Sequence, residues 1–172
     1  EVDRNPDWSA FVARLVQDFE VQRKDFKGMP KTVFLGGGTP SRMPPEQISK
    51  LISEIAHGAI EVSMECNPED ISSERIDGWL AAGINRLSIG LQTLNKGFAN
   101  LLNRAASVPQ SNEILALVQD SRFKSWSIDL IFALPNQGLD DLKADLDLLL
   151  EYDVPHVSLY GLTWEPGTPF YN

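Results

Sequence analysis

The sequence predicts an α/β fold built on a parallel sheet, and two observations lead to this prediction. Apolar segments that separate the expected strands have helical periodicity, so helices and strands alternate along the chain. Such alternation is typical of parallel strands joined by crossover helices, because parallel neighbours cannot be linked by a tight turn. The second observation is that runs of strand length recur at residues 32–35, 61–65, 86–90, 126–131 and 156–160.

Five helices are expected around these strands. The first should span residues 8–19, where apolar side chains recur at i, i+3, i+4 and i+7. Asn5 and Pro6 are expected to be its cap and first position, since proline is favoured at the start of a helix. The remaining apolar stripes predict helices around residues 48–55, 72–83, 114–118 and 142–150.

The length of the chain decides which parallel architectures are possible. An eightfold βα barrel needs roughly 250 residues, whereas this chain has 172. Five strands are too few to close a barrel. The sequence therefore predicts one domain over 1–172, either an open doubly wound sheet or a partial TIM-like barrel whose strands form an open arc. Because the two edges of such an arc are unpaired, a dimer through the sheet edges is a further expectation.

Composition excludes several classes of partner. The formal net charge is −9 and no cluster of basic residues occurs, which argues against nucleic acid and anionic membranes. No apolar run approaches the roughly 18 residues of a membrane span, so we expect no membrane insertion and a cytoplasmic protein. The single cysteine, Cys66, excludes an internal disulfide and a metal site with several thiolates in this chain.

Polar residues and glycines follow the predicted strands. In parallel α/β folds the carboxyl ends of the strands meet at the ligand. We therefore expect a bare glycine backbone, two carboxylates and an amide to converge at one edge of the sheet. The residues at these positions are Gly36, Gly37, Gly38, Thr39, Glu65, Gln92 and Asp129.

Each of these features also has a purely structural interpretation. The glycines would form a tight turn, Glu65 would cap the next segment, and Asp129 would be a buried acid with structural partners. Cys66 is expected to be a small buried apolar residue. Phosphate-binding motifs fit poorly, because no lysine follows the glycines and Ser41 stands where a dinucleotide fingerprint needs its third glycine. An open-sheet nucleotide-binding domain, with Glu65 as its ribose-binding acid, remains the weaker alternative.

Five motifs together indicate a known family. They fall in order at five consecutive strand ends and read VFLGGGTPS, MECNPED, INRLSIGLQT, WSIDLIFALPNQ and HVSLYGLTWEPGTPFY. On these motifs the chain resembles the radical S-adenosylmethionine (SAM) family of oxygen-independent coproporphyrinogen III oxidases and HemW-like haem chaperones. The resemblance extends from about Asp7 to the last residue.

The resemblance implies a partial TIM-like barrel that binds SAM and a [4Fe–4S] cluster. In the family, a loop with three cysteines after the first strand holds the cluster, and this sequence contains no such loop. We therefore expect a fragment that lacks both the upstream cluster loop and a downstream C-terminal domain. The cluster would belong to the full-length protein, this chain would supply no metal ligand, and the chain alone would be inactive.

The resemblance also implies contacts with SAM. The glycine run and Thr39 would lie against its methionyl part, and Glu65 would pair with its ammonium group. Arg104 would bind the SAM carboxylate, a task suited to a planar guanidinium, while Gln92 and Asp129 would hold the ribose. The predicted cofactor-binding residues are therefore Gly36, Gly37, Gly38, Thr39, Glu65, Gln92, Arg104 and Asp129, and no catalytic residue is assigned.

The resemblance leaves the branch of the family open, with porphyrinogen or haem as the small-molecule partner in either case. The motifs GGGTPS and MECNP favour the haem chaperones, since the decarboxylating oxidases tend to have threonine at Ser41 and Asp-Pro at 67–68. Asn103-Arg104 points the other way. The alternatives are a coproporphyrinogen III dehydrogenase that decarboxylates propionates to vinyl groups, and a SAM-binding scaffold of unassigned substrate. Ala133 and Asn136 stand where family members usually have glycine, which predicts an altered turn there.

Overall fold

A computed structural model describes residues 6–104 and 110–167, which form one five-stranded parallel sheet. The strands lie in sequence order and every neighbouring pair is parallel. Their bounds are β1 (Thr32–Leu35), β2 (Glu61–Cys66), β3 (Arg86–Gln92), β4 (Ser125–Phe132) and β5 (Val157–Gly161). The predicted open arc is confirmed, and the doubly wound alternative is wrong because that topology would reverse the strand order at a switch point. Dimerisation through the outermost strands, β1 and β5, stays a prediction.

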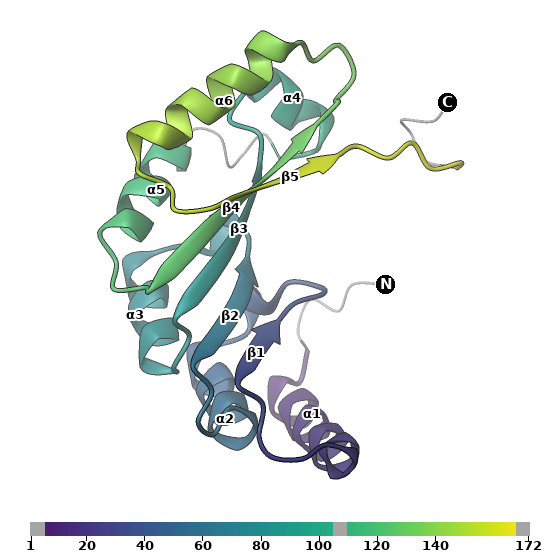
Figure 1. Cartoon of the computed structure of the whole chain (residues 1–172), viewed down its shortest axis with the longest axis vertical. Helices are drawn as coiled ribbons and strands as arrows, with labels where there is room; N and C mark the ends of the chain where they lie inside the picture. Colours follow the sequence, from purple (N-terminus) through teal and green to yellow (C-terminus); the bar gives the residue numbers. More distant parts are fainter. Residues whose placement is uncertain (1–5, 105–109, 168–172) are drawn as a thin grey trace.

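Helices cover one face of the sheet and leave the other face concave (Figure 1). Helices α2, α3, α5 and α6 lie along the convex side, and α1 packs beside α2 near β1. Within the described ranges no helix is long and apolar enough to cross a membrane. The helices are α1 (Trp8–Gln22), α2 (Pro45–Ile55), α3 (Ser73–Ala81), α4 (Lys96–Leu101), α5 (Ser111–Gln119) and α6 (Leu139–Glu151).

Helix α1 begins with a different cap from the expected one, and helix α4 was not expected. Asp7, not Asn5 or Pro6, caps α1, and its Oδ1 accepts a hydrogen bond from the Ala10 N–H (2.9 Å). A carboxylate at this position satisfies a free backbone donor and interacts favourably with the helix dipole; Asn5 lies outside the described residues. Helix α4 was not predicted, because only Ala99 of its six residues is buried and no apolar stripe marks it.

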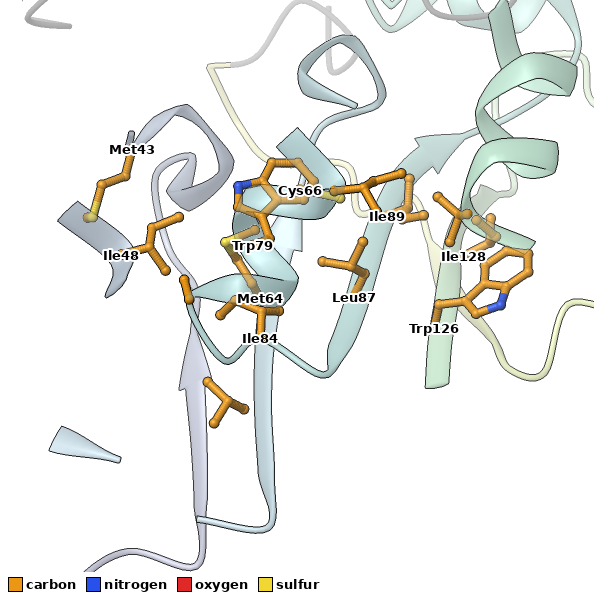
Figure 2. Packing of buried hydrophobic residues seen from close by; sticks show 14 of the residues in the cluster. Met43, Ile48, Met64, Cys66, Trp79, Ile84, Leu87, Ile89, Trp126 and Ile128 are labelled. Carbon is orange, nitrogen blue, oxygen red and sulfur yellow. The ribbon is translucent and has the colours of Figure 1, made fainter. Parts of the chain in front are cut away.

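The hydrophobic core lies between the sheet and the convex-side helices (Figure 2). Side chains alternate across a strand, so Met64, Leu87 and Ile128 share the helix-facing side, where all three are fully buried. Trp79 of α3 and Ile48 of α2 close this layer from the helix side and are also fully buried. The intervening residues of β2, β3 and β4 are therefore directed to the concave face.

The turn after β4 contains two residues in the left-handed region. Ala133 and Asn136 adopt left-handed conformations, with φ of +61° and +63°. Only glycine adopts this region without steric cost, and other L-residues pay about 1–2 kcal/mol there. Alanine and asparagine thus occupy conformations in which glycine would be free of this cost; whether the turn differs from that of family members stays a prediction.

A buried acid joins α6 to the segment that leaves β3. Asp145 is 3% exposed, and it accepts hydrogen bonds from Thr93 Oγ1 (2.8 Å) and the Leu94 N–H (3.2 Å). Burial raises the pKa of Asp145, although the bonds from Thr93 and Leu94 oppose that shift. Asp145 thereby fixes the chain just beyond the carboxyl end of β3, where the predicted site begins.

We expect Asp145→Ala to lower the free energy of unfolding by about 1–3 kcal/mol, because the buried Thr93 hydroxyl and the Leu94 N–H lose their acceptor. Denaturant unfolding measures this change. The matched control is Asp147→Ala, which removes an exposed carboxylate from the same helix and should change stability by less than about 0.5 kcal/mol. Equal stability losses for the two variants would contradict the structural role of Asp145.

Candidate cofactor cleft

A cleft of about 390 Å³ opens at the carboxyl ends of the strands, on the concave side of the sheet. Strands β2, β3 and β4 contribute to its floor, and the loop after β1 closes one side. The structure therefore brings together most of the residues that the sequence predicted at one edge. Of the eight predicted cofactor-binding residues, those that line the cleft are Gly38, Thr39, Glu65, Gln92 and Asp129.

Glu65 and the glycine loop are held together by one hydrogen bond. The Gly37 N–H donates to Glu65 Oε2 (3.1 Å), which ties the loop after β1 to the end of β2. Gly37 has a φ of +87°, a conformation that favours glycine. The backbone therefore explains why this residue is glycine, independently of any ligand. Gly36 lies away from this cleft and lines a second, apolar cavity between α1, β1 and α2.

Neither the backbone conformation nor a close neighbour explains why residue 38 is glycine. A Cβ at this position would meet no heavy atom within 4 Å, and its φ is outside the left-handed region. Nothing in the described protein therefore forbids a side chain at Gly38, although this residue lines both the cleft and the apolar cavity beside α1. Among the three glycines, Gly38 is the one whose absence of a side chain is best explained by a bound molecule.

A bulge in β3 directs Gln92 into the cleft. The register between β3 and β4 shifts between Ile89 and Gln92, and Gln92 has a φ of +68°. Bulges re-aim side chains and are frequent beside functional sites. Gly90 makes room for this arrangement, because a Cβ on Gly90 would lie 2.8 Å from Gln92 Nε2. A left-handed glutamine is a strained feature that the local sequence did not predict.

Asp129 lines the cleft with one carboxylate oxygen hydrogen-bonded and the other buried without a partner. Its Oδ2 accepts a hydrogen bond from Ser88 Oγ (3.0 Å). Its Oδ1 is buried and has no hydrogen-bond partner within the part of the chain that the structure describes. Because a buried acceptor without a partner is costly, the arrangement fits a ligand that donates a hydrogen bond to Oδ1.

The electrostatic character of the cleft is acidic. Glu65 and Asp129 contribute carboxylates, and over the described ranges no lysine, arginine or histidine lines the cleft. A ligand with positive charge and hydroxyl donors is therefore favoured, whereas a phosphate group would be repelled. This argues against the nucleotide-binding alternative, which needs a site for phosphate.

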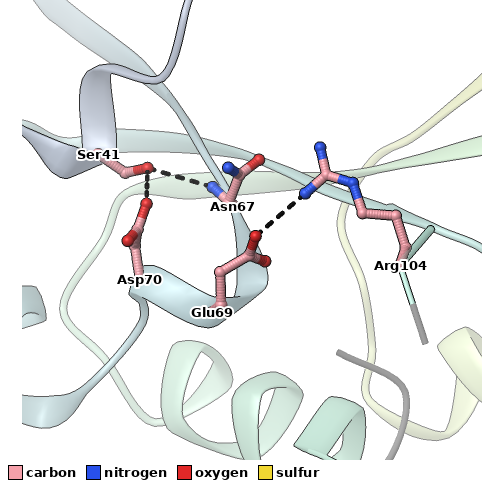
Figure 3. Close-up of polar contacts among 5 residues, drawn as sticks. All are labelled: Ser41, Asn67, Glu69, Asp70 and Arg104. Carbon is pink, nitrogen blue, oxygen red and sulfur yellow. Dashed lines mark hydrogen bonds and ion pairs between the residues drawn. The ribbon is translucent and has the colours of Figure 1, made fainter. Parts of the chain in front are cut away.

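Arg104 is placed at the border of the site, outside the lining of the cleft (Figure 3). Its Nη1 lies 3.2 Å from Glu69 Oε1 in an ion pair that is partly exposed, so the pair itself adds little stability. The ion pair brings Arg104 beside the loop after β2, next to Asn67 (Figure 3). Ala105 and Ala106, which follow it, lie outside the described residues.

Ser41 forms a buried junction between the loops after β1 and β2 (Figure 3). Its Oγ donates to Asp70 Oδ2 (2.6 Å) and accepts from the Asn67 N–H (3.2 Å), while its carbonyl accepts from Arg75. The sequence singled out positions 41 and 67 together only as markers of the family branch, and Ser41 also as a mismatch to the dinucleotide fingerprint. In the structure they are in contact, which a reading of separate motifs could not find.

Cys66 is a core residue, as the sequence predicted. It is buried, and burial, reinforced by the carboxylates of Asp70, Asp129 and Glu69, raises the pKa of its thiol. A thiol of this kind stays neutral and is a poor metal ligand. Over the described residues no group of three or more His, Cys, Asp or Glu side chains could hold a metal ion.

Comparison with known proteins agrees with the geometry. Residues 3–149 match the family model of the Radical SAM superfamily. The chain belongs to the radical SAM superfamily. The superfamily implies SAM and a [4Fe–4S] cluster as cofactors, and the resemblance inferred from the five motifs is confirmed.

Individual relatives place the chain within this superfamily. It is 35% identical over 170 residues to the heme chaperone HemW of Haemophilus influenzae, covering 93% of this chain and 44% of the relative. It is 36% identical over 151 residues to HemW of Bacillus subtilis, covering 83% of this chain and 39% of that protein. The chain thus spans less than half the length of these curated relatives.

A solved structure supports the same placement. Coproporphyrinogen III oxidase (HemN) from Escherichia coli aligns with a TM-score of 0.83 and 27% identity, over 96% of this chain and 39% of that one. An archaeal Elp3 from Methanocaldococcus infernus aligns with a TM-score of 0.66 at 17% identity, which shows the shared fold alone. The open five-stranded arc is thus part of the larger radical SAM fold.

The two glycines beside the cleft should respond differently to substitution. We expect Gly37→Ala to lower the free energy of unfolding by about 1–2 kcal/mol, because alanine is strained at a φ of +87°. Gly38→Ala should be close to neutral or slightly stabilising, since its Cβ would meet no neighbour. Denaturant unfolding of both variants measures the difference, and a reversed order would contradict the loop conformation.

We also expect the chain of residues 1–172 to take up no stoichiometric iron–sulfur cluster. A cluster needs three or four cysteine thiolates, and the sequence has one. Anaerobic reconstitution followed by iron and sulfide analysis tests this. One cluster per chain would show that ligands other than cysteine hold it.

Proposed function

We propose that this chain is the SAM-binding core of a HemW-like haem chaperone, in a protein that handles haem or porphyrin. The observation that carries the proposal is the acidic cleft, which Glu65, Gly38 and Asp129 line and in which Asp129 Oδ1 is buried without a partner among the described residues. The radical SAM family and the HemW relatives support it independently. Bound together, SAM and the cluster would supply one-electron chemistry at the carboxyl ends of the strands.

Each part of the cleft has a counterpart in SAM. The bare backbone at Gly38 and Thr39 would lie against the methionyl chain, and Glu65 would accept from the ammonium group. Asp129 Oδ1 and the amide of Gln92 would bind the ribose hydroxyls. The net positive charge of SAM, from its sulfonium and ammonium groups, matches the two carboxylates.

The predicted residues that do not line the cleft, Gly36, Gly37 and Arg104, would assist SAM binding from its border. Gly36 and Gly37 would set the path of the loop, with Gly37 fixed to Glu65 by its N–H. Arg104 would reach the SAM carboxylate from the border of the cleft, in exchange for or in addition to its ion pair with Glu69. Ile131 and Tyr160 supply an apolar wall at the β4–β5 end of the cleft, suitable for the adenine ring.

The choice of the chaperone branch rests on the sequence relatives. HemW proteins from several bacteria are 30–36% identical to this chain, whereas HemN is 27% identical in the structural alignment. The Ser41–Asn67 junction uses the residue types that favoured the chaperones. The specific alternative is a coproporphyrinogen III dehydrogenase, supported by the structural likeness to HemN.

We expect Asp129→Asn to weaken SAM binding by about tenfold or more in the natural full-length protein. The variant loses a charged acceptor, and a hydrogen bond to a charged group contributes about 1.5–3 kcal/mol. Calorimetric titration with SAM measures the dissociation constant. Asp120→Asn, the same change at an exposed position beyond α5, is the control and should bind like the parent. Unchanged affinity for Asp129→Asn would remove Asp129 from the site.

We expect Gly38→Val to abolish SAM binding while the melting temperature stays close to that of the parent. Gly38 lies where the cleft and the apolar cavity meet, so we expect the valine side chain to clash with bound SAM and with nothing in the free protein. Gly37→Val would not serve as this test, because the left-handed φ of Gly37 makes that variant strained in the free protein. Full SAM affinity in Gly38→Val would return the glycine to a structural role.

The branch is decided by two assays on the same full-length protein. A haem chaperone should bind haem, seen as a shifted Soret band, and should leave coproporphyrinogen III unchanged under reducing conditions with SAM. Conversion of the two propionates to vinyl groups would instead establish the dehydrogenase. Neither haem binding nor conversion, with SAM binding intact, would restrict the proposal to a SAM-binding core.

A further inference from the structure

We propose that Ser88, Ser127 and Arg86 form a one-directional hydrogen-bond chain that positions Asp129 for its ligand. The inference rests on the proposed SAM site, in which Asp129 is a ligand-binding group. It adds three positioning residues, none of which the sequence motifs singled out for a role. Their task is to hold Oδ2 of Asp129 so that Oδ1, which is buried and without a partner among the described residues, keeps a fixed position for a hydrogen bond from the ligand.

The contacts run in a single order along the concave face. Arg86 Nη2 donates to Ser127 Oγ (3.4 Å), and Ser127 Oγ donates to Ser88 Oγ (3.1 Å). Ser88 Oγ in turn donates to Asp129 Oδ2 (3.0 Å). The alternative acceptor of the Ser127 hydroxyl, the Leu87 carbonyl, is more distant at 3.4 Å. Each hydroxyl thus accepts one hydrogen bond and donates one toward the carboxylate.

The parallel register of β3 and β4 creates this chain. Ser88 pairs with Ser127, and the positions two residues away on each strand share their face of the sheet. Arg86 and Ser88 therefore lie on the same side of β3 as Ser127 and Asp129 do on β4. Barrel interiors are dominated by branched aliphatic side chains, so hydroxyls and a guanidinium in these positions need an explanation other than packing.

Polarisation along this chain of hydrogen bonds strengthens the last bond, which holds Asp129. Aligned hydrogen bonds strengthen one another in a protein interior, and a donor with a positive charge at the far end acts in the same direction. The last bond fixes Asp129 Oδ2, while Asp129 Oδ1 remains buried and without a partner in the described chain. A carboxylate held in this way loses less freedom when a ligand binds, which increases affinity by preorganisation. The 3.4 Å contact of Arg86 is the weakest of the three, so its contribution should be the smallest.

The test compares serine variants in the natural full-length protein by calorimetric titration with SAM. We expect Ser88→Ala to raise the dissociation constant about 5- to 10-fold and Ser127→Ala to raise it about 2- to 3-fold. Ser88→Thr should keep most of the affinity because it retains the hydroxyl. Ser158→Ala is the matched control. Ser158 pairs with Asp129 from β5 but is not part of the hydrogen-bond chain, so this variant should leave the affinity unchanged.

A double-mutant cycle separates positioning from direct contact. In an Asp129→Ala background, Ser88→Ala should have no further effect on the SAM dissociation constant if Ser88 acts through Asp129. A further 5- to 10-fold loss there would mean that Ser88, which also lines the cleft, contacts SAM itself, and would overturn the inference. If Ser88→Ala does not fold, Ser127→Ala in the same two backgrounds makes the same comparison.

The two proposals fail in different ways. If Asp129→Ala binds SAM like the parent, Asp129 is not part of the site, and the proposed function loses its main support. If Asp129→Ala weakens binding but Ser88→Ala and Ser127→Ala do not, the SAM site stands and the positioning chain is wrong. Loss of affinity in Ser88→Ala that Ser88→Thr does not restore would also contradict the chain.

Discussion

The alternation of side chains along β2, β3 and β4 is the constraint on which the rest of this structure depends. One face of each strand supplies the buried residues that pack under the helices, such as Met64, Leu87 and Ile128. The other face carries Glu65 and Asp129. A shift of one residue in the register of any strand would exchange these two sets. Core packing and the position of the site are therefore fixed by the same hydrogen-bonded pairing, and neither can change alone.

Backbone conformations that are unfavourable for most residues occur at the carboxyl ends of three strands, as well as elsewhere in the described chain. Gly37 after β1, Gln92 at the end of β3 and Ala133 after β4 all have positive φ. Two of the three are not glycine, so the protein bears a local cost at the edge where the cleft opens. Strain of this kind persists where the surrounding structure over-determines it, and Asp145, which fixes the segment after Gln92, is one such surrounding contact.

The cleft combines acidity with an unfilled acceptor, and these two properties select the same kind of ligand. Because the described lining holds two carboxylates and no basic side chain, the cleft attracts positive charge. The buried, unpartnered Asp129 Oδ1 favours a ligand that donates a hydrogen bond from a hydroxyl group. A molecule with both features matches the cofactor of the radical SAM superfamily to which the chain belongs. The chain spans less than half of its HemW relatives, so partners and substrate of the whole protein are matters for the proposed experiments.

The sequence by itself determined the alternation of helices and parallel strands and the family, because these depend on local periodicity and on motifs that are continuous in the chain. The resemblance to the family implied the partial barrel, but the order of the strands in the sheet was decided by the structure. The sequence also indicated that Gly38, Glu65, Gln92 and Asp129 would meet, because the carboxyl ends of parallel strands share one edge. Only the tertiary structure decided which glycine is required by a positive φ and which lines the cleft. A run of identical residues gives no information on the φ of each residue or on the space around it. The tertiary structure alone placed Arg104 beside Glu69, Ser41 beside Asn67, and Ser88 and Ser127 behind Asp129. These contacts join residues far apart in the chain, and strand register and loop packing, which no local pattern specifies, bring them within hydrogen-bond distance.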